Sequence, residues 1–391
     1  MTGGFPDVHT RILRRARCLI GALLIGLSTF LGTGMAAASE TLPPFIKTPP
    51  GYAIEHFAQV PRARTLVPVP ELGVIFVGQR GPQVHAIVDA DQDMRPEKVV
   101  RIFDDLNVAN GIDWKDGWLY IAEQHRISRW RARSLKELMS AQPEVLYDKL
   151  PDDPWHGWRY ARFGPDGMLY VAIGAPCNIC SLNGIEGSII RLAPPGTRGP
   201  KAPEIFAYGV RNSVGFDFQP GSGDLFFTDN GADNMGDDVP PDEFNHAPRK
   251  GLWFGFPWFG GGTARTDEFA DKSLPRPHTP PVVRFGAHVA ALGISFYRGT
   301  MFPKDAVGDA FVAHHGSWNR TVPDGYRVAR VRVDKKSGAA QSWEPFVTGF
   351  LRPDGSKWGR PVDVKELPDG SMLVSDDFRG AVYRITYGKA N

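Results

Sequence analysis

Short apolar runs, paired across turns that contain glycine, recur along most of this 391-residue chain. Apolar and polar positions alternate within the runs, and a turn such as Asp-Gly supplies the positive φ angle that a tight hairpin needs. Each pair of runs therefore predicts two antiparallel β-strands. Four copies are clear and two are degenerate: Gly111–Ala122, Ala161–Ala172, Val214–Thr228 and Val362–Val374, then Thr65–Val77 and Gly293–Val312.

Six hairpins at wide spacing favour an all-β fold, a six-bladed β-propeller with four strands in each blade. A pair of β-sandwiches is the rival architecture, but it does not explain the recurring Asp-Gly-x-Leu-Tyr-Val unit. Amphipathic helices are scarce, and Ser134–Ala141 is the best short candidate. The two widest gaps, Gly231–Gly293 and Gly316–Val362, leave room for loops inserted at the rim, where binding residues concentrate.

The first 38 residues have the composition of an export signal. Its positive residues, apolar segment and small cleavage-site residues follow in order: Arg11, Arg14, Arg15 and Arg17, then Cys18–Met35, then Ala36–Ala38. We therefore expect a signal peptide at residues 1–38, and a single propeller at residues 40–391 that is periplasmic or secreted, without stable membrane insertion after cleavage. An uncleaved single-span anchor is the alternative. A twin-arginine signal fits poorly, because of the residues that follow Arg15.

Positive and negative residues are nearly balanced, with 45 Lys and Arg against 43 Asp and Glu. Beyond the signal no basic run stands out, which argues against a nucleic-acid partner. Only Cys177 and Cys180 remain outside the signal. In an exported chain this pair favours a small local disulfide over a redox or zinc centre, because no second cysteine pair or paired histidine completes a metal set. Free thiols are the alternative.

His156 is the candidate general base. It stands between Trp155 and Trp158, next to Gly157 and ahead of a predicted strand, so it would project from a blade end towards the channel mouth. An imidazole with its ordinary pKa near ~6.5 can remove a proton from a hydroxyl group at neutral pH. The alternative is a structural histidine, packed on its tryptophan neighbours and bonded to backbone. The remaining histidines show no metal-ligand spacing, and most are expected to be structural.

An Arg-Asn pair and an acidic loop follow further along the chain. Arg211 offers a planar fork for carboxylates, and Asn212 adds a donor and an acceptor. The loop Asp229–Glu243 is rich in carboxylates, with Gly231 and Gly236 allowing tight turns, and such oxygen ligands favour Ca²⁺ over transition metals. It is not an EF-hand, because the ligand spacing and flanking helices are missing. A solvated acidic loop, with Arg211 paired to a nearby acid, is the alternative.

Two later segments place further cations at predicted blade ends. Arg320 ends Gly316–Arg320, and Arg360 lies in Lys357–Pro361. Together they could complete a ring of positive charge over a polyanionic ligand, although a single arginine is more often a surface residue. A cation site beside a clamp for oxyanions indicates an enzyme with a charged organic cofactor.

The order of these motifs is more specific than any one of them. Trp-His-Gly precedes Phe-Gly-Pro-Asp-Gly-Met-Leu-Tyr-Val, and then come Gly-Val-Arg-Asn-Ser-Val-Gly, Thr-Asp-Asn-Gly, Gly-Asp-Asp-x-Pro-Pro-Asp-Glu, His-Gly-Ser-Trp-Asn-Arg and Gly-Arg-Pro-Val-Asp-Val. From about Gly51 to Tyr387 the chain resembles the soluble quinoprotein glucose/sorbosone dehydrogenase family, closest to its sorbosone dehydrogenase-like branch. The resemblance implies a six-bladed propeller that binds pyrroloquinoline quinone (PQQ) and Ca²⁺ at the channel mouth.

The resemblance also assigns roles to single residues. It makes His156 the general base, and it places Arg211 and Asn212 against the quinone and its carbonyls. The backbone carbonyls of Gly231 and Ala232 would hold the calcium ion of the cofactor.

Other assignments lie at the edge of the resemblance. Glu243, with Asp242 beside it, matches a nearby structural calcium loop. Arg320 falls near a family lysine that contacts the cofactor. Arg360 falls near a pair of cofactor-binding arginines, of which this chain keeps only one, so one charge contact is lost. Asn110 is the best substitute for a cofactor-contacting glutamine of the glucose-oxidising branch.

The implied reaction is oxidation of an aldose, or of a sorbosone-like sugar aldehyde, to a lactone or acid. His156 would take the hydroxyl proton while a hydride passes to the quinone, and a further electron acceptor is required. Two alternatives belong to other classes. A calcium-dependent lactonase on a six-bladed propeller needs carboxylates and a base but no quinone. A non-catalytic exported propeller needs neither the quinone nor calcium.

Overall fold

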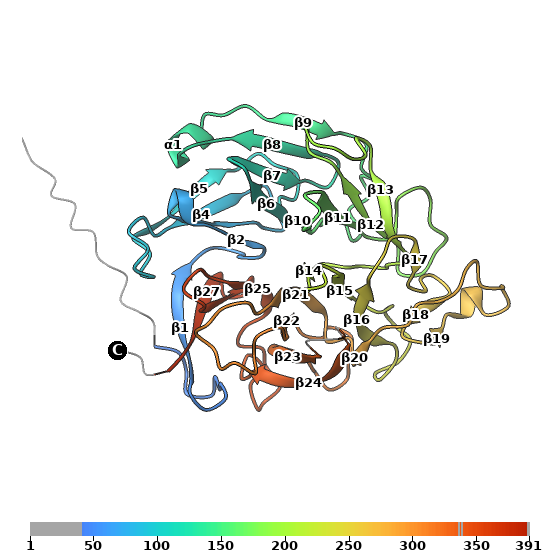
Figure 1. Ribbon diagram of the computed structural model, residues 1–391. Coiled ribbons are helices and arrows are strands. Elements are labelled where there is room, and N and C mark those ends of the chain that lie inside the picture. Colours follow the sequence, from blue (N-terminus) through green and yellow to red (C-terminus); the bar gives the residue numbers. More distant parts are fainter. Residues whose placement is uncertain (1–40, 335–336, 338, 389–391) are drawn as a thin grey trace, which may run out of the picture. The chain divides into compact units, whose positions relative to one another are not determined.

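The computed structural model describes residues 41–334, 337 and 339–388 of the chain, so the predicted signal peptide lies outside the described residues. Six sheets of antiparallel strands follow one another around a common axis, as Figure 1 shows. In the third sheet a fifth strand, β17 (Leu252–Trp253), adds in parallel to β13 (Glu204–Tyr208). The prediction of an all-β, six-bladed propeller is confirmed, and six sheets around one axis exclude the pair of β-sandwiches. No helix within the described part of the chain is long and apolar enough to cross a membrane.

Five blades are built from strands that follow in chain order, with the first strand innermost. The innermost strands of most neighbouring blades contact each other, which places these strands around the axis. Blades 1 to 3 contain β2 (Leu66–Val69), β3 (Val74–Val77), β4 (Val84–Val88) and β5 (Lys98–Phe103); β6 (Gly111–Lys115), β7 (Trp118–Ala122), β8 (Ile127–Arg131) and β9 (Glu144–Tyr147); β10 (Ala161–Phe163), β11 (Leu169–Ile173), β12 (Ser188–Leu192) and β13 (Glu204–Tyr208). Blades 4 and 5 contain β14 (Phe216–Phe218), β15 (Leu225–Asp229), β16 (Pro241–Ala247) and β20 (Val283–Ala287); β21 (Ala291–Phe296), β22 (Ala310–His314), β23 (Arg327–Val333) and β24 (Ala340–Val347).

Blade 6 closes the ring with strands from both ends of the described chain. Its outermost strand is β1 (Tyr52–Gln59), which pairs antiparallel with β27 (Ala381–Tyr387), while β26 (Met372–Asp376) and β25 (Pro361–Glu366) lie further in. The six hairpins predicted from the sequence are the two innermost strands of the six blades.

The insertions are smaller than the sequence suggested. The predicted helix is a single turn, α1 (Leu135–Leu138), whose cap Ser134 accepts a hydrogen bond from the backbone N–H of Glu137 at 3.2 Å. The gap after Gly316 is mostly filled by β23 and β24, so an insert was expected there wrongly. The gap after Gly231 does hold an insert, made of β17 (Leu252–Trp253), β18 (Phe259–Gly261), β19 (Ala264–Arg265) and a short 3₁₀ turn, η2 (Asp267–Phe269). The other short 3₁₀ turn is η1 (Pro70–Leu72).

The apolar core is divided among the faces where neighbouring blades pack. Phe76, Ile112 and Trp130 belong to the cluster between blades 1 and 2. Phe226 and Phe296 meet edge to face between blades 4 and 5, with ring centroids 5.3 Å apart. Because each sheet is covered on both faces by its neighbours, the ring provides a rigid support for the loops at its ends.

Buried aspartates link the innermost strands of every second blade to the next blade. Asp113 accepts a hydrogen bond from the N–H of Phe163 at 2.7 Å, and Asp217 accepts one from Phe296 at 2.8 Å. Asp363 does the same for Leu66 at 2.9 Å, across the junction of blades 6 and 1. Asp217 also forms ion pairs with Arg162 at 3.0 Å and Arg298 at 3.1 Å. The buried charge of Asp217 is therefore neutralised by arginines on neighbouring blades.

Candidate functional site

A cavity of about 750 Å³ opens at one end of the propeller. The lining residues lie before or at the start of a blade's innermost strand, after its second strand or, for Asp242, at the start of its third strand, so they all lie at the same end. His156, Arg211, Asn212, Gly231, Asp242 and Arg360 are among its lining residues. Six residues predicted from separate motifs, on three blades, therefore meet around one space.

His156 presents a free ring nitrogen to this cavity. The residue is buried, and its Nδ1–H donates to the carbonyl oxygen of Ala175 at 2.9 Å. A carbonyl can only accept, so this hydrogen bond fixes the proton on Nδ1 and leaves Nε2 as an acceptor. Burial, then the charges of Arg211 and Arg80, lower the pKa of His156 to about 3. The imidazole is therefore unprotonated at neutral pH, as a base must be.

The local backbone holds His156 in an unusual conformation. Its φ angle is 53°, in the left-handed region that L-residues rarely adopt. A Cβ atom at Gly174 would collide with the Cβ of His156 and lie 2.7 Å from its carbonyl oxygen. Glycine at position 174 is therefore required for His156 to pack against this strand end.

Arg211 is fixed almost completely by neighbouring groups. Its Nε donates to the carbonyl of Asn178 at 3.0 Å, one terminal nitrogen donates to the side chain of Asn178 at 2.7 Å, and the same nitrogen pairs with Asp233 at 3.0 Å. Asn178 lies in the short loop closed by the disulfide between Cys177 and Cys180, which the structure shows as predicted. The disulfide loop thus positions the guanidinium at the cavity wall.

Arg64 is a lining residue that the sequence did not indicate. Its terminal nitrogen pairs with Asp377 at 2.6 Å, and Asp377 also accepts a hydrogen bond from Nε2 of His315 at 2.8 Å. Against the effect of burial, His315, Arg64 and Arg360 hold the pKa of Asp377 below its ordinary value. Asn110 is not among the lining residues; its side-chain oxygen accepts from Nε of Arg64 at 2.8 Å, so it positions that arginine.

Two further arginines at the cavity have no carboxylate partner. Arg80 lies over the ring of Trp158, 3.7 Å from its centroid. Arg360 donates only long hydrogen bonds, to the carbonyls of His315 at 3.4 Å and Gly316 at 3.3 Å. Neither forms an ion pair with any acidic residue that the structure describes. Arg80 and Arg360 are therefore cavity arginines whose charge no described carboxylate contacts.

Buried carboxylates lie beneath the cavity. Asp229 and Glu243 are opposite each other on β15 and β16, and both line a separate space of about 10 Å³, roughly enough for one water-sized occupant. Burial raises the pKa of Asp229 to about 7 and that of Glu243 to about 8. Asp229 also accepts hydrogen bonds from the backbone N–H groups of Arg211 at 2.7 Å and Asn212 at 2.6 Å. This carboxylate therefore sets the turn that carries both cavity residues.

Of the two residues predicted to hold the cofactor's calcium ion, Gly231 lines the cavity, whereas Ala232 is fully buried and is not among the lining residues. Asp242 accepts hydrogen bonds from the N–H of Gly231 at 2.8 Å and of Ala290 at 2.6 Å, and burial raises its pKa to about 6. The N–H of Ala232 donates to Gly260 at 2.6 Å. These bonds use the amide hydrogens, and the carbonyls of Gly231 and Ala232 accept no hydrogen bond from the described backbone.

Arg320 lies outside the cavity lining. It donates to the carbonyl of Asp237, pairs with the exposed Asp238 at 3.2 Å and bonds to Val322 at 3.1 Å. Its guanidinium therefore ties two surface loops together.

His315 was among the histidines without an assigned role, yet it lines the cavity. Its neighbour His314 is buried against Phe285.

Comparison with known proteins places the chain in a family. It is 34% identical over 377 residues to an "uncharacterized protein" of Borreliella burgdorferi, an alignment that covers 92% of this chain and 96% of the relative. The chain belongs to the family of this borrelial protein. Residues 246–388 of the chain also match the model of the TrAA12-like family. This segment contains the insert before β20 and the strands β20 to β27.

Two solved structures share the fold. The holo form of a pyranose dehydrogenase PQQ domain from Coprinopsis cinerea has a TM-score of 0.72 and 18% identity, and it covers 88% of this chain and 98% of its own. A calcium structure of a Trichoderma reesei carbohydrate-active enzyme of family AA12 has a TM-score of 0.70 and 17% identity, with 88% and 97% covered. The chain therefore shares its fold with these two proteins.

Proposed function

We propose that this protein is an exported, PQQ- and calcium-dependent dehydrogenase that oxidises an aldose or a sorbosone-like sugar aldehyde to a lactone or acid. The observation that carries the proposal is a neutral imidazole that shares one cavity with arginines lacking carboxylate partners. A periplasmic or secreted location accords with the sequence of residues 1–38, and the electrons would pass to a further acceptor.

The residues at the cavity suit an anionic quinone. PQQ has three carboxylates, and Arg80 and Arg360 supply two positive charges that no described acid pairs with. Arg211 and Arg64 are held rigidly at the wall, so they offer a fixed positive field rather than flexible contacts. The side-chain oxygens of Asn230 and Asn319, both lining the cavity, are buried without a hydrogen-bond partner among the described residues.

Calcium fits the same end of the molecule. The carbonyls of Gly231 and Ala232 are hard oxygen ligands without backbone donors, and Asp242 holds the loop that presents them. Glu243, with Asp229 opposite, lines the smaller space beneath the cavity, where a divalent cation would offset two buried carboxylates. We assign the cofactor's calcium to the first set and a structural calcium to the second.

His156 is assigned the role of general base. Its Nε2 accepts the proton of the sugar hydroxyl, while the hydrogen bond from Nδ1 to Ala175 holds the ring in orientation. When bound, the quinone supplies a hydride acceptor that the protein itself lacks. The negative charge of such a cofactor would raise the pKa of His156 from its low value towards the working range.

The cavity mouth suits a sugar ring. Trp155 and Trp318 line the cavity yet remain 51% and 70% exposed, which is uncommon for side chains of this size. Their flat apolar faces can cover the C–H face of a pyranose, while Asp153 and Asn319 offer polar groups to hydroxyls.

Reconstitution tests the proposal directly. Apo-protein is titrated with PQQ in the presence of Ca²⁺ by calorimetry, and reduction of an artificial electron acceptor is followed over a panel of aldoses and sugar aldehydes. The expected result is saturable PQQ binding and dye reduction that requires both PQQ and a sugar.

Two results would contradict it. Hydrolysis of lactones that is unchanged by PQQ would indicate the calcium-dependent lactonase. Absence of PQQ binding, together with no turnover of any sugar, would indicate a non-catalytic propeller.

A further inference from the structure

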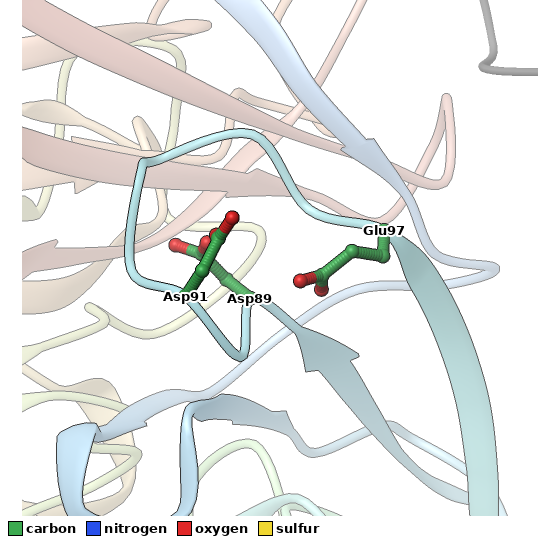
Figure 2. Close-up of side chains that lie close together, drawn as sticks. All are labelled: Asp89, Asp91 and Glu97. Carbon is green, nitrogen blue, oxygen red and sulfur yellow. The ribbon is translucent and has the colours of Figure 1, made fainter.

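The loop between β4 and β5 gathers three carboxylates on the face opposite the cavity. Asp89 directly follows β4, Asp91 comes two residues later and Glu97 stands directly before β5. One oxygen from each lies within 4.8 Å of an oxygen from each of the others. Figure 2 shows the carboxylate of Glu97 directed from the start of β5 towards the two aspartates.

The topology separates this loop from the candidate active site. In blade 1 the cavity residues Arg64 and Arg80 precede β2 and follow β3, so the turn between β2 and β3 is at the far end. The β4–β5 loop packs on that turn, because the N–H of Asp89 donates to the carbonyl of Gly73 at 2.9 Å and the side chain of Gln92 donates to Pro70 at 3.1 Å.

Asp89 is the informative member of the cluster. Its side chain is 4% exposed, and its Oδ1 is buried without a hydrogen-bond partner within the part of the chain that the structure describes. A buried carboxylate oxygen without a partner is costly. An exposed acidic cluster alone indicates nothing, but an acceptor buried inside one indicates a missing donor or cation.

No described basic residue neutralises the three carboxylates. Neither Asp89, Asp91 nor Glu97 forms an ion pair with a described Lys, Arg or His. Elsewhere in the described chain, partly buried acids such as Asp309 and Asp369 have arginine partners. Burial raises the pKa of Asp89, and Asp93, Glu97 and Asp91 raise it further.

The loop has the chemistry of a calcium site. We propose that the carboxylate oxygens of Asp89, Asp91 and Glu97 coordinate one Ca²⁺ ion in the β4–β5 loop. Two ligands of one Ca²⁺ ion, each at about 2.4 Å, lie at most about 4.8 Å apart, and these oxygens lie within that limit of one another.

The backbone agrees with this assignment. Met94 has a φ angle of 65° at the sixth position counted from Asp89, where a calcium loop with alternating aspartates needs a sharp turn and usually has glycine. The N–H of Ala90 donates to Glu97 at 3.1 Å and closes the loop around the cluster. Water molecules would complete the coordination on the exposed side.

Calcium counting on the full chain tests the site without reference to PQQ. Apo-protein is titrated with CaCl₂ by calorimetry, up to about 10 mM, on the order of ten times the weakest dissociation constant of extracellular calcium modules. The double variant Asp91→Asn, Glu97→Gln should bind one Ca²⁺ fewer than the wild type. The control Asp116→Asn, an 82% exposed acid in the turn between β6 and β7 of the next blade, should bind the same number.

Thermal unfolding provides a second readout. Calcium should raise the melting temperature of the wild type by about 2–4 °C more than that of the double variant. In EDTA the double variant should unfold at or above the wild-type temperature, since it lacks the mutual repulsion of the carboxylates.

Equal calcium stoichiometry in wild type and double variant would overturn the proposal, and so would a calcium-induced rise of the same size in both. Dye-linked sugar oxidation by the PQQ-loaded double variant should stay at the wild-type level. Failure of the proposed function would leave the calcium count unchanged, so the two proposals fail separately.

Discussion

The channel interior and the cavity at its mouth both bury charged side chains, but they treat them differently. In the channel, Asp217 pairs with Arg162 and Arg298 and accepts a hydrogen bond from a backbone N–H of the next blade. At the mouth, Arg80 and Arg360 face the cavity without a described carboxylate partner. Paired charges fix the arrangement of the blades, whereas unpaired charges are available to a ligand.

The same contrast applies to the buried histidines. His314 is buried among Phe285 and Trp343, and burial holds its pKa well below the ordinary value. His156 is also buried and neutral, yet its Nε2 is free at the wall of a 750 Å³ cavity. Burial alone therefore does not distinguish a structural histidine from a candidate base. The distinction is whether the free ring nitrogen faces a cavity or packed side chains.

The largest effect is expected at His156. His156→Ala should lower the turnover of the PQQ-loaded enzyme by about 10²–10⁴-fold, the usual contribution of a general base, with PQQ affinity largely kept. Dye-linked kinetics and calorimetry measure the two quantities. His56→Ala, on the outermost strand of blade 6, is the control and should leave both unchanged. Undiminished turnover in His156→Ala would remove this residue from the mechanism.

Removal of a paired charge should affect stability instead. Asp217→Ala leaves Arg162 and Arg298 without their carboxylate, and breaking a buried pair in this way costs about 3–5 kcal/mol of unfolding free energy. Urea denaturation measures it. Asp238→Ala, which breaks an exposed pair with Arg320, should have little effect. Similar losses of unfolding free energy in the two variants would show that the buried ion pairs of Asp217 stabilise the fold no more than the exposed pair of Asp238 does.

Removal of an unpaired charge should affect the ligand and not the fold. Arg360→Gln should weaken PQQ binding by about 10–100-fold, since one charge-assisted contact is lost, with no loss of stability in the apo-protein. Arg320→Gln should weaken it far less, because that guanidinium bonds to Asp237 away from the cavity. The reverse order of affinities would restore Arg320 as a cofactor contact.

The smallest expected effect is on pH dependence. A protonated His156 cannot accept a proton, so activity should fall as pH drops through its folded pKa, which Arg80 helps to lower. Arg80→Gln should move this acid limb to higher pH, by less than about one unit. Arg131→Gln, another arginine over a tryptophan ring, is the matched control. An unchanged limb in Arg80→Gln would mean that another group controls it.

The same pKa shift has a consequence for stability. Unfolded His156 titrates near 6.5 and the folded residue near 3, so the unfolded chain binds the extra proton between these values. The free energy of unfolding should therefore decrease as pH falls from about 6.5 towards 3. Above pH 7 the titration of His156 should no longer affect the free energy of unfolding.

Much of the fold was predictable because its signals are local. An Asp-Gly turn between two apolar runs specifies a hairpin, and six of them specified the two innermost strands of every blade. The closing strand was not predictable in this way. β1 pairs Tyr52 with Tyr387, at the other end of the chain, and no local pattern encodes such a partner.

The site was predicted only where a motif marked it. His156, Arg211 and Arg360 lie in distinctive segments, whereas Arg64 and Arg80 are isolated arginines in unremarkable loops. Their common signal is positional, since most cavity residues precede an innermost strand or follow a second strand. Arg320 meets that condition yet bonds to a neighbouring loop, because spacing along the chain does not set the direction of a side chain.

A structure of the protein with PQQ and Ca²⁺ tests the central claim most directly. The account predicts quinone density in the 750 Å³ cavity, with its carboxylates at Arg80 and Arg360 and a reactive carbonyl near Nε2 of His156. Quinone bound elsewhere on the propeller, or a cavity that stays filled with water at saturating PQQ, would contradict it.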